Sequence, residues 1–170
     1  GVQTCALPIL GRPDGTDRDG VGEPVDPAGP ALAGIRVLDL TWVYAGPFAT
    51  RWLAYEGAEV IRVESTTRPD QVRGAGQPFN RQGGPEDSLQ WHNVNAGKKS
   101  LQLNLGVPEG RQVIADLARH CDVLIESFAP GVLRRMGLGP EELRAQNDQL
   151  IYVSTSLFGQ TGPLSKVPGF

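Results

Sequence analysis

Residues that cross-link a chain or bind metal are scarce in this 170-residue sequence, which contains two cysteines and two histidines. Cys5 and Cys121 lie far apart and make no disulfide framework, so a reducing compartment is expected and the cytoplasm is the predicted location. His92, His120 and Cys121 lack the spacing of a finger-type zinc site. We therefore expect no bound metal.

Long apolar runs and an excess of one charge are also missing. No apolar stretch approaches the ~20 residues that a membrane helix requires, so no membrane is expected as a partner. The formal net charge is −3 with both signs interspersed, which makes nucleic acid an unexpected partner as well. A hydrophobic content of 39% is typical of one soluble globular unit.

The two ends of the chain do not resemble parts of a natural domain. Residues 1–9 read GVQTCALPI, which the sequencing-adaptor string GGA GTT CAG ACG TGT GCT CTT CCG ATC encodes in frame, so we interpret them as translated adaptor rather than an ordinary leader. Residues 10–31 are rich in Gly, Pro and Asp and are predicted to be a disordered leader. Residues 32–170 are interpreted as the N-terminal part of a truncated domain, because the sequence stops in a turn.

Between these ends, strand and helix patterns alternate. Short apolar and β-branched runs predict strands over residues 35–40, 60–63, 101–103, 123–125 and 150–154. Helices are predicted over residues 47–56, 108–120, 132–136 and 140–146, with a long exposed loop over 65–86. The alternation predicts an α/β fold, with a Rossmann-like parallel sheet and helices on both faces.

Helical spacing also predicts which side chains face the sheet. In the first helix Phe48, Trp52 and Leu53 share one face, whereas Thr50 and Arg51 face away. In the second helix Val113, Ile114 and Leu117 are expected on the buried side. Gly57 has the position of a C-cap residue for the first of these helices.

The most informative segment is the turn from the first strand into the first helix, residues 38–47. Such a turn is where α/β proteins bind anionic ligands, because free N–H groups and the helix dipole point outward there. The turn lacks the G-x-G-x-x-G spacing of a dinucleotide fold and the G-x-x-x-x-G-K of a phosphate loop. A nicotinamide-dependent oxidoreductase is therefore disfavoured, since the fold class alone does not indicate a function.

Four segments together resemble one family. They are LAGIRVLDLTWVYAGPFATRWLAYEGAEVIRVE (32–64), NAGKKSLQLNL (95–105), CDVLIESFAPGVLRRMGLGPEEL (121–143) and LIYVSTSLFGQTGP (150–163). In this order they are similar to the class III coenzyme A transferases, the CaiB/BaiF family. That family also includes formyl-CoA transferases and 2-methylacyl-CoA racemases. The resemblance extends from Leu32 to Phe170.

The resemblance implies a function. Members move CoA between an acyl-CoA donor and a carboxylic acid acceptor, through an aspartyl mixed anhydride, as interlocked homodimers. The family's aspartate lies beyond the end of this sequence, so no residue here is assigned as nucleophile. Racemases carry a catalytic histidine where this chain has Phe170, and phenylalanine cannot transfer a proton. A transferase is therefore the preferred interpretation; a racemase and a non-catalytic CoA-binding fragment are the alternatives.

The resemblance also implies which residues contact coenzyme A. Some transferases have Gln at the position of Tyr44, so formyl or oxalate chemistry is disfavoured. The family's basic residue after Glu64 is Ser65 here, and its phosphate contact is either lost or supplied by Arg68 or Arg73. The implied coenzyme-binding residues are Val43, Tyr44, Ala45, Lys98, Leu103, Asn104, Leu105, Ser127, Phe128 and Arg135.

For several of these residues a purely structural role is the alternative. Tyr44 fits a surface aromatic and Leu103 a core position. Arg135 is expected to meet the coenzyme phosphates, for which a planar guanidinium is suited, although a lone helical arginine is more often solvated. Lys98 and Lys99 either reach the phosphates or are exposed.

Overall fold

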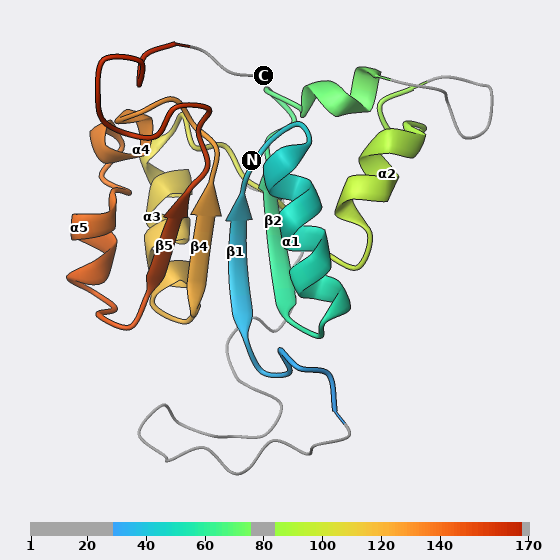
Figure 1. The fold of residues 1–170 in the computed structure, drawn as a ribbon, viewed down its shortest axis with the longest axis horizontal. Helices are drawn as coiled ribbons and strands as arrows, with labels where there is room; N and C mark the ends of the chain where they lie inside the picture. Colours follow the sequence, from blue (N-terminus) through green and yellow to red (C-terminus); the bar gives the residue numbers. More distant parts are fainter. Residues whose placement is uncertain (1–28, 76–83, 168–170) are drawn as a thin grey trace.

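Five parallel strands form a single sheet in the order β3-β2-β1-β4-β5 (Figure 1). In this computed structural model, which describes residues 29–75 and 84–167, they are β1 (Arg36–Leu40), β2 (Glu59–Glu64), β3 (Lys99–Gln102), β4 (Val123–Glu126) and β5 (Ile151–Ser154). Every pairing is parallel, which confirms the predicted sheet. The segment interpreted as translated adaptor, most of the segment predicted as a leader, and Phe170 lie outside the described residues.

Helices cover both faces of this sheet, as predicted. They are α1 (Ala45–Tyr55), α2 (Leu89–Asn95), α3 (Pro108–Ala118), α4 (Val132–Arg135) and α5 (Pro140–Arg144), with a 3₁₀ helix, η1, over Gln71–Gly74. Figure 1 shows α1 and α2 to the right and α3, α4 and α5 to the left. All five residues of β1 are buried, which is the pattern of a strand covered on both faces.

Alternate residues of β1 divide the core into two parts. Leu38 and Leu40 pack with Ile114 of α3 and with Leu133 and Leu143 of α4 and α5. On the opposite face, Val37 packs with Val60 and Ile125 of the neighbouring strands, against which Leu53 and Ala54 of α1 lie. The period-2 alternation of a strand explains how one short segment serves both parts of the core.

The predicted face of α1 is wrong for Phe48, Trp52 and Thr50, although Leu53 does pack against the core. Thr50 is fully buried, whereas Phe48 and Trp52 are 44% and 49% exposed. The reason is that Asp39 lies on the sheet beneath α1, and the Thr50 hydroxyl donates to its Oδ2 at 2.7 Å. The buried carboxylate of Asp39 therefore favours a hydroxyl side chain on the inner face of α1, and the rings of Phe48 and Trp52 pack edge to face on the outside. Val113 of α3 is also exposed, although Ile114 and Leu117 are buried as predicted.

The predicted loop over residues 65–86 is only partly a loop. It contains η1, in which Val72 is buried, and the preceding Asp70 is also buried. The Ser88 hydroxyl donates to the carbonyl of Val72 at 2.6 Å and accepts the N–H of Trp91, so it caps α2 and ties α2 to η1. Both η1 and α2 are short and are held by polar contacts, so they show no hydrophobic periodicity. The sequence therefore indicated neither of them.

Gly110 sets how closely α3 approaches the segment that follows β3. A Cβ at this position would lie 2.0 Å from the carbonyl oxygen of Asn104, so only glycine fits. The chain from Leu103 to Leu105 thus rests directly on the first turn of α3.

We expect Gly110→Ala to destabilise the chain by about 2 kcal/mol or more, because the added methyl group meets rigid backbone. Gly74→Ala is the matched control, since a Cβ there meets nothing within 4 Å, and it should be neutral or slightly stabilising. Urea-induced unfolding measures both free energies. Equal midpoints for the two variants would contradict the proposed close approach.

Candidate functional site

The strand order reverses between β1 and β4, and a cavity opens at the carboxyl ends of the strands around that point. In open α/β sheets this crevice is the usual ligand site. The cavity measures about 410 Å³. Its lining residues are Leu40, Trp42, Val43, Val63, Glu64, Ser65, Thr67, Arg68, Gln71, Leu103, Asn104, Leu105, Gly106, Ser127, Phe128 and Met136.

Six of the sequence-predicted site residues line this cavity: Val43, Leu103, Asn104, Leu105, Ser127 and Phe128. They come from the segments after β1, β3 and β4, which the parallel sheet brings to one edge. Apolar walls with a few polar groups at the rim are typical of a small-molecule site. Sequence reasoning missed Met136, Thr67 and Gln71, and no pattern in the sequence marked them.

Two hydrogen bonds hold the turn after β1 against the cavity. The N–H of Trp42 donates to the Ser127 hydroxyl at 2.8 Å, and the N–H of Val43 donates to the carboxylate of Asp70 at 3.2 Å. Val43 has φ +68°, a left-handed conformation that strains a β-branched residue by about 1–3 kcal/mol. The cavity wall therefore contains a strained residue with a specific partner.

Beneath this turn lies a buried ion pair between Asp39 and Lys98. Their side chains are 0% and 1% exposed, and Lys98 Nζ lies 3.0 Å from Asp39 Oδ2. The ammonium also donates to the carbonyl of Pro47 at 2.8 Å and to Asn95 Oδ1 at 2.9 Å. All three of its protons therefore have acceptors inside the protein.

The structure thus places Lys98 outside the cavity, with its side chain buried and its ammonium group bonded inside the protein. Lys99 pairs with Glu59 at 2.7 Å, at the amino end of β2 and away from the cavity. Two of the polar partners of Lys98, Asp39 and Pro47, lie 59 and 51 residues away from it, so the sequence gave no sign that the adjacent lysines have different roles.

Burial and charge act in opposite directions on this ion pair. Burial alone raises the pKa of Asp39, but the charges of Lys98 and Arg62 and the hydroxyls of Thr41 and Thr50 outweigh it, so the pKa is lowered. Burial lowers the pKa of Lys98 to about 8, in spite of the attraction of Asp39. Both groups are therefore charged at neutral pH.

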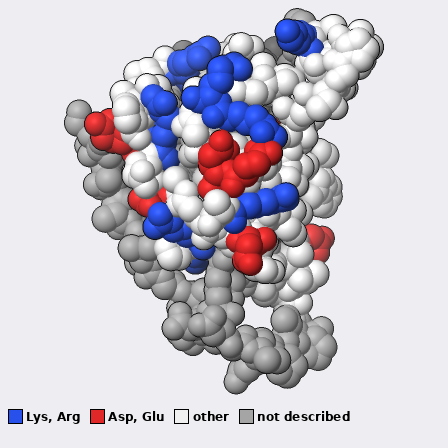
Figure 2. All heavy atoms as spheres, turned by 90° about the vertical axis from the view of Figure 1, so that its left-hand side faces the viewer, with Lys and Arg blue, Asp and Glu red and all other residues white. Residues whose placement is uncertain are grey.

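The remaining predicted residues lie near the cavity without lining it. Tyr44 is 43% exposed and its hydroxyl bonds to Gln90 of α2, and Ala45 is the first residue of α1. Arg135 is exposed on α4. Figure 2 shows basic side chains gathering toward the top of the α4 and α5 side, the end at which the strand arrowheads of Figure 1 point.

Of the two arginines left open as phosphate ligands, the structure brings only Arg68 to the cavity. The guanidinium of Arg73 donates to both carboxylate oxygens of Glu64, at 2.7 and 2.8 Å, and stacks on Trp91 with 3.8 Å between Arg73 Cζ and the ring centroid. Arg73 is therefore a structural residue, whereas Arg68 is exposed at the rim.

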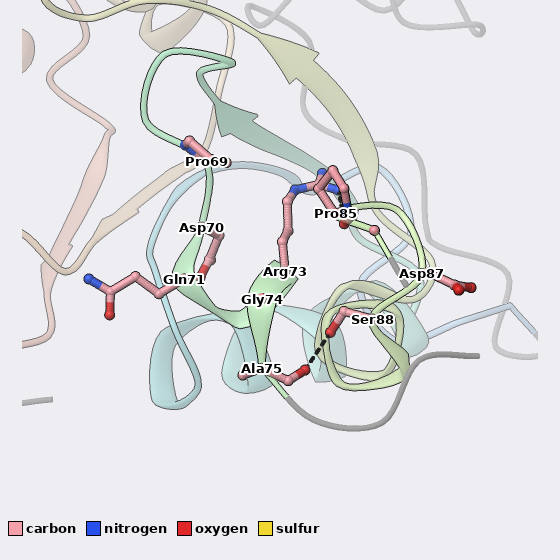
Figure 3. Close-up of a pocket in the computed structure, with 10 residues that line it drawn as sticks. Pro69, Asp70, Gln71, Arg73, Gly74, Ala75, Pro85, Asp87 and Ser88 are labelled. Carbon is pink, nitrogen blue, oxygen red and sulfur yellow. Dashed lines mark hydrogen bonds between the residues drawn. The ribbon is translucent and has the colours of Figure 1, made fainter. Parts of the chain in front are cut away.

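A second hollow of about 510 Å³ lies beside η1 (Figure 3). Arg73 reaches across it toward Pro85, and the Ser88 hydroxyl donates to the Ala75 carbonyl at 3.0 Å. Of the residues considered for coenzyme contacts from the sequence, Arg73 is the one that lines it. Among residues 29–75 and 84–167, no group of three or more His, Cys, Asp or Glu side chains could hold a metal ion. No helix in the same part is long and apolar enough to cross a bilayer.

Comparisons with known proteins point to one family. A family model described as CoA-transferase family III matches residues 32–170. The chain is 45% identical over 139 residues to the succinyl-CoA:glutarate CoA-transferase of Homo sapiens, covering 82% of this chain and 31% of that protein. It is 42% identical over 143 residues to the succinate–glutarate CoA-transferase of Agrobacterium fabrum, covering 83% and 36%.

A solved structure of a CaiB/BaiF family protein from Brucella suis matches with a TM-score of 0.75 at 35% sequence identity, covering 84% of this chain and 37% of that one. The chain thus spans about a third of the length of these relatives.

We expect Lys98→Met to destabilise the chain by about 3 kcal/mol or more, because it leaves the Asp39 carboxylate buried without its ion-pair partner. Lys99→Met is the control: its side chain is 54% exposed and its loss should change the free energy of unfolding by less than about 1 kcal/mol. The double variant Lys98→Met/Asp39→Asn should lose less than the sum of the single variants in urea unfolding.

The pH dependence of the same variant has a definite sign. Since the folded-state pKa of Asp39 lies below its ordinary value of 3.8, its contribution to stability is present above that pH and is lost as the pH falls. Without Lys98 this pKa rises, so Lys98→Met should lose stability at a higher pH than the parent chain. Parallel pH profiles would contradict the ion pair.

Proposed function

The chain belongs to CoA-transferase family III, and from that premise we propose that the full-length protein transfers CoA from an acyl-CoA donor to a carboxylic acid acceptor. The observation that supports this most is the cavity at the reversal of strand order, which combines six residues implied by the family resemblance. In this proposal residues 32–170 form the coenzyme side of the active site.

The composition of the cavity suits the chemically distinct parts of coenzyme A. Leu103, Leu105, Phe128 and Met136 offer apolar surface to the adenine and pantetheine groups. Arg68 supplies a positive charge for the phosphates, in place of the basic residue that the family has at the position of Ser65. Arg135 on α4 is a second candidate for a phosphate contact.

Tyr44 and Ala45 would lie toward the reacting end of the coenzyme. They begin α1, and no side chain caps the N-terminus of this helix. Uncapped N–H groups and the helix dipole favour negative charge there. This suits a carboxylate substrate.

The proposed reaction proceeds in four displacements. A carboxylate nucleophile, supplied from outside this chain, attacks the acyl-CoA carbonyl and releases CoA thiolate, which leaves a mixed anhydride. The thiolate then attacks the enzyme's carbonyl of that anhydride, which releases the donor acid and leaves an enzyme-CoA thioester. The acceptor carboxylate attacks that thioester, which releases CoA thiolate and forms a second mixed anhydride. The thiolate then attacks the acceptor's carbonyl in this anhydride, which gives the new acyl-CoA and frees the enzyme carboxylate. The role of this chain is to bind CoA throughout.

Two alternatives stay open. A 2-methylacyl-CoA racemase is disfavoured by Phe170, which cannot exchange a proton. The isolated 170-residue chain would be a CoA-binding fragment without transferase activity, because it offers no assigned nucleophile.

For the full-length protein we also propose a cytoplasmic, interlocked homodimer.

The activity is tested on the full-length protein, with succinyl-CoA as donor and glutarate as the first acceptor in a panel of carboxylic acids. We expect new acyl-CoA products, detected by liquid chromatography and mass spectrometry, for at least one donor and acceptor pair. Epimerisation of a 2-methylacyl-CoA with no exchange on any pair would instead support the racemase.

The phosphate contact is tested separately. We expect Arg68→Ala to weaken CoA binding about tenfold, because it removes a charge-assisted contact worth about 1.5 kcal/mol. Arg119→Ala provides the control, since Arg119 is exposed just beyond the last residue of α3 and does not line the cavity. Calorimetric titration with CoA measures both, and equal affinities would exclude Arg68 as the phosphate ligand.

A further inference from the structure

Val43 is the one non-glycine residue in residues 29–75 and 84–167 with a positive φ, and its side chain lines the cavity. A β-branched residue adopts this conformation only where its surroundings impose it. Strained residues of this kind cluster at ligand sites, so the groups that hold Val43 in this conformation also contribute to the site.

The group that holds Val43 is the carboxylate of Asp70. Both of its oxygens lie within reach of the Val43 N–H, at 3.2 and 3.3 Å. Asp70 is 1% exposed and does not line the cavity, so its carboxylate does not touch a ligand there and reaches the cavity wall through the Val43 N–H.

Asp70 is in turn fixed from two directions. Its carboxylate accepts a hydrogen bond from Arg62 Nη2 at 2.6 Å and from the N–H of Val72 at 3.1 Å. Its own N–H donates to Glu64 Oε1 at 2.7 Å. The carboxylate is therefore held rigidly by β2 and η1 while it bonds to the turn after β1.

The buried guanidinium of Arg62 also requires the negative charge of Asp70. The side chain of Arg62 is 1% exposed, and its Nε and Nη1 have no hydrogen-bond partner among the described residues. Asp70 forms the ion pair with this buried guanidinium, so a neutral residue at position 70 would leave the Arg62 charge buried without its ion-pair partner and would weaken the contact that holds the side chain at position 70. An amide could still accept from Val43 but would not stay fixed.

From this geometry we propose that Asp70 is a positioning residue, which keeps Val43 in the left-handed conformation and so shapes the cavity for coenzyme A. The inference rests on the proposed function for the identity of the ligand. The arrangement of the turn itself can be measured without any ligand.

The first measurement is amide hydrogen exchange at Val43 in the full-length protein without ligand. Asp70→Asn should speed exchange at Val43 at least tenfold, because the N–H loses a fixed acceptor. Glu86→Gln is the control: Glu86 is an exposed acidic residue that pairs with Arg73, and its loss should leave exchange at Val43 unchanged. Unchanged protection in Asp70→Asn would overturn the proposal, whatever the protein binds.

The second measurement is CoA affinity. Asp70→Asn should weaken CoA binding about tenfold, because the free energy needed to keep Val43 in its left-handed conformation then has to come from CoA binding. In that background Val43→Gly should bind CoA at least threefold more tightly than Val43→Ala, since glycine adopts a positive φ without strain. A merely structural role for Asp70 would not produce this order, and the reverse order would overturn the proposal.

The outcomes separate the two proposals. If the parent protein does not bind CoA, the proposed function fails while the exchange result still decides the role of Asp70. Faster exchange with unchanged CoA affinity would overturn the link between Asp70 and the cavity. If Asp70→Asn does not fold, the parent background decides: Val43→Gly should unfold at higher urea than Val43→Ala, and the opposite order would refute the strain.

Discussion

A negative charge buried in the middle of a parallel sheet is the constraint on which the rest of this structure depends. The carboxylate of Asp39 is inaccessible to water, and an ionised carboxylate is tolerated there only with a countercharge and hydrogen bonds. Lys98 supplies the charge, and the hydroxyls of Thr41 and Thr50 supply hydrogen bonds. Thr50 thereby fixes α1 on the sheet, and Lys98 fixes the connection between α2 and β3.

A second buried ion pair, Arg62 with Asp70, continues this network toward the ligand cavity. Arg62 is the register neighbour of Asp39 on β2, so the two ion pairs lie side by side in the sheet. The first orients the helix and the second orients the turn that precedes it. The proposed coenzyme cavity therefore has walls supported by ionic contacts in the interior, whereas only a few of its own lining residues carry charge.

The sequence indicated those features that depend on local pattern or on family resemblance. The strands β1 and β4 were predictable because each is short and rich in Val, Leu or Ile, and the family was predictable from four motifs in order, which the match over residues 32–170 confirms. Leu103 and Ser127 were implied by the same motifs, and the structure places both in one cavity. The burial of Thr50 and Lys98 was not predictable, because their shared partner lies 11 and 59 residues away and polar side chains contribute nothing to hydrophobic periodicity. The choice between Arg68 and Arg73 likewise required the ion pair with Glu64.

The three tryptophans of this chain occupy three different environments. Trp42 lines the cavity, Trp91 lies under the guanidinium of Arg73, and Trp52 stands on the outer face of α1 between Phe48 and Tyr55. Their intrinsic fluorescence is therefore separable: a collisional quencher in solution reaches Trp52 most readily, whereas occupation of the cavity alters the emission of Trp42. The protein thus carries its own optical probe of the site.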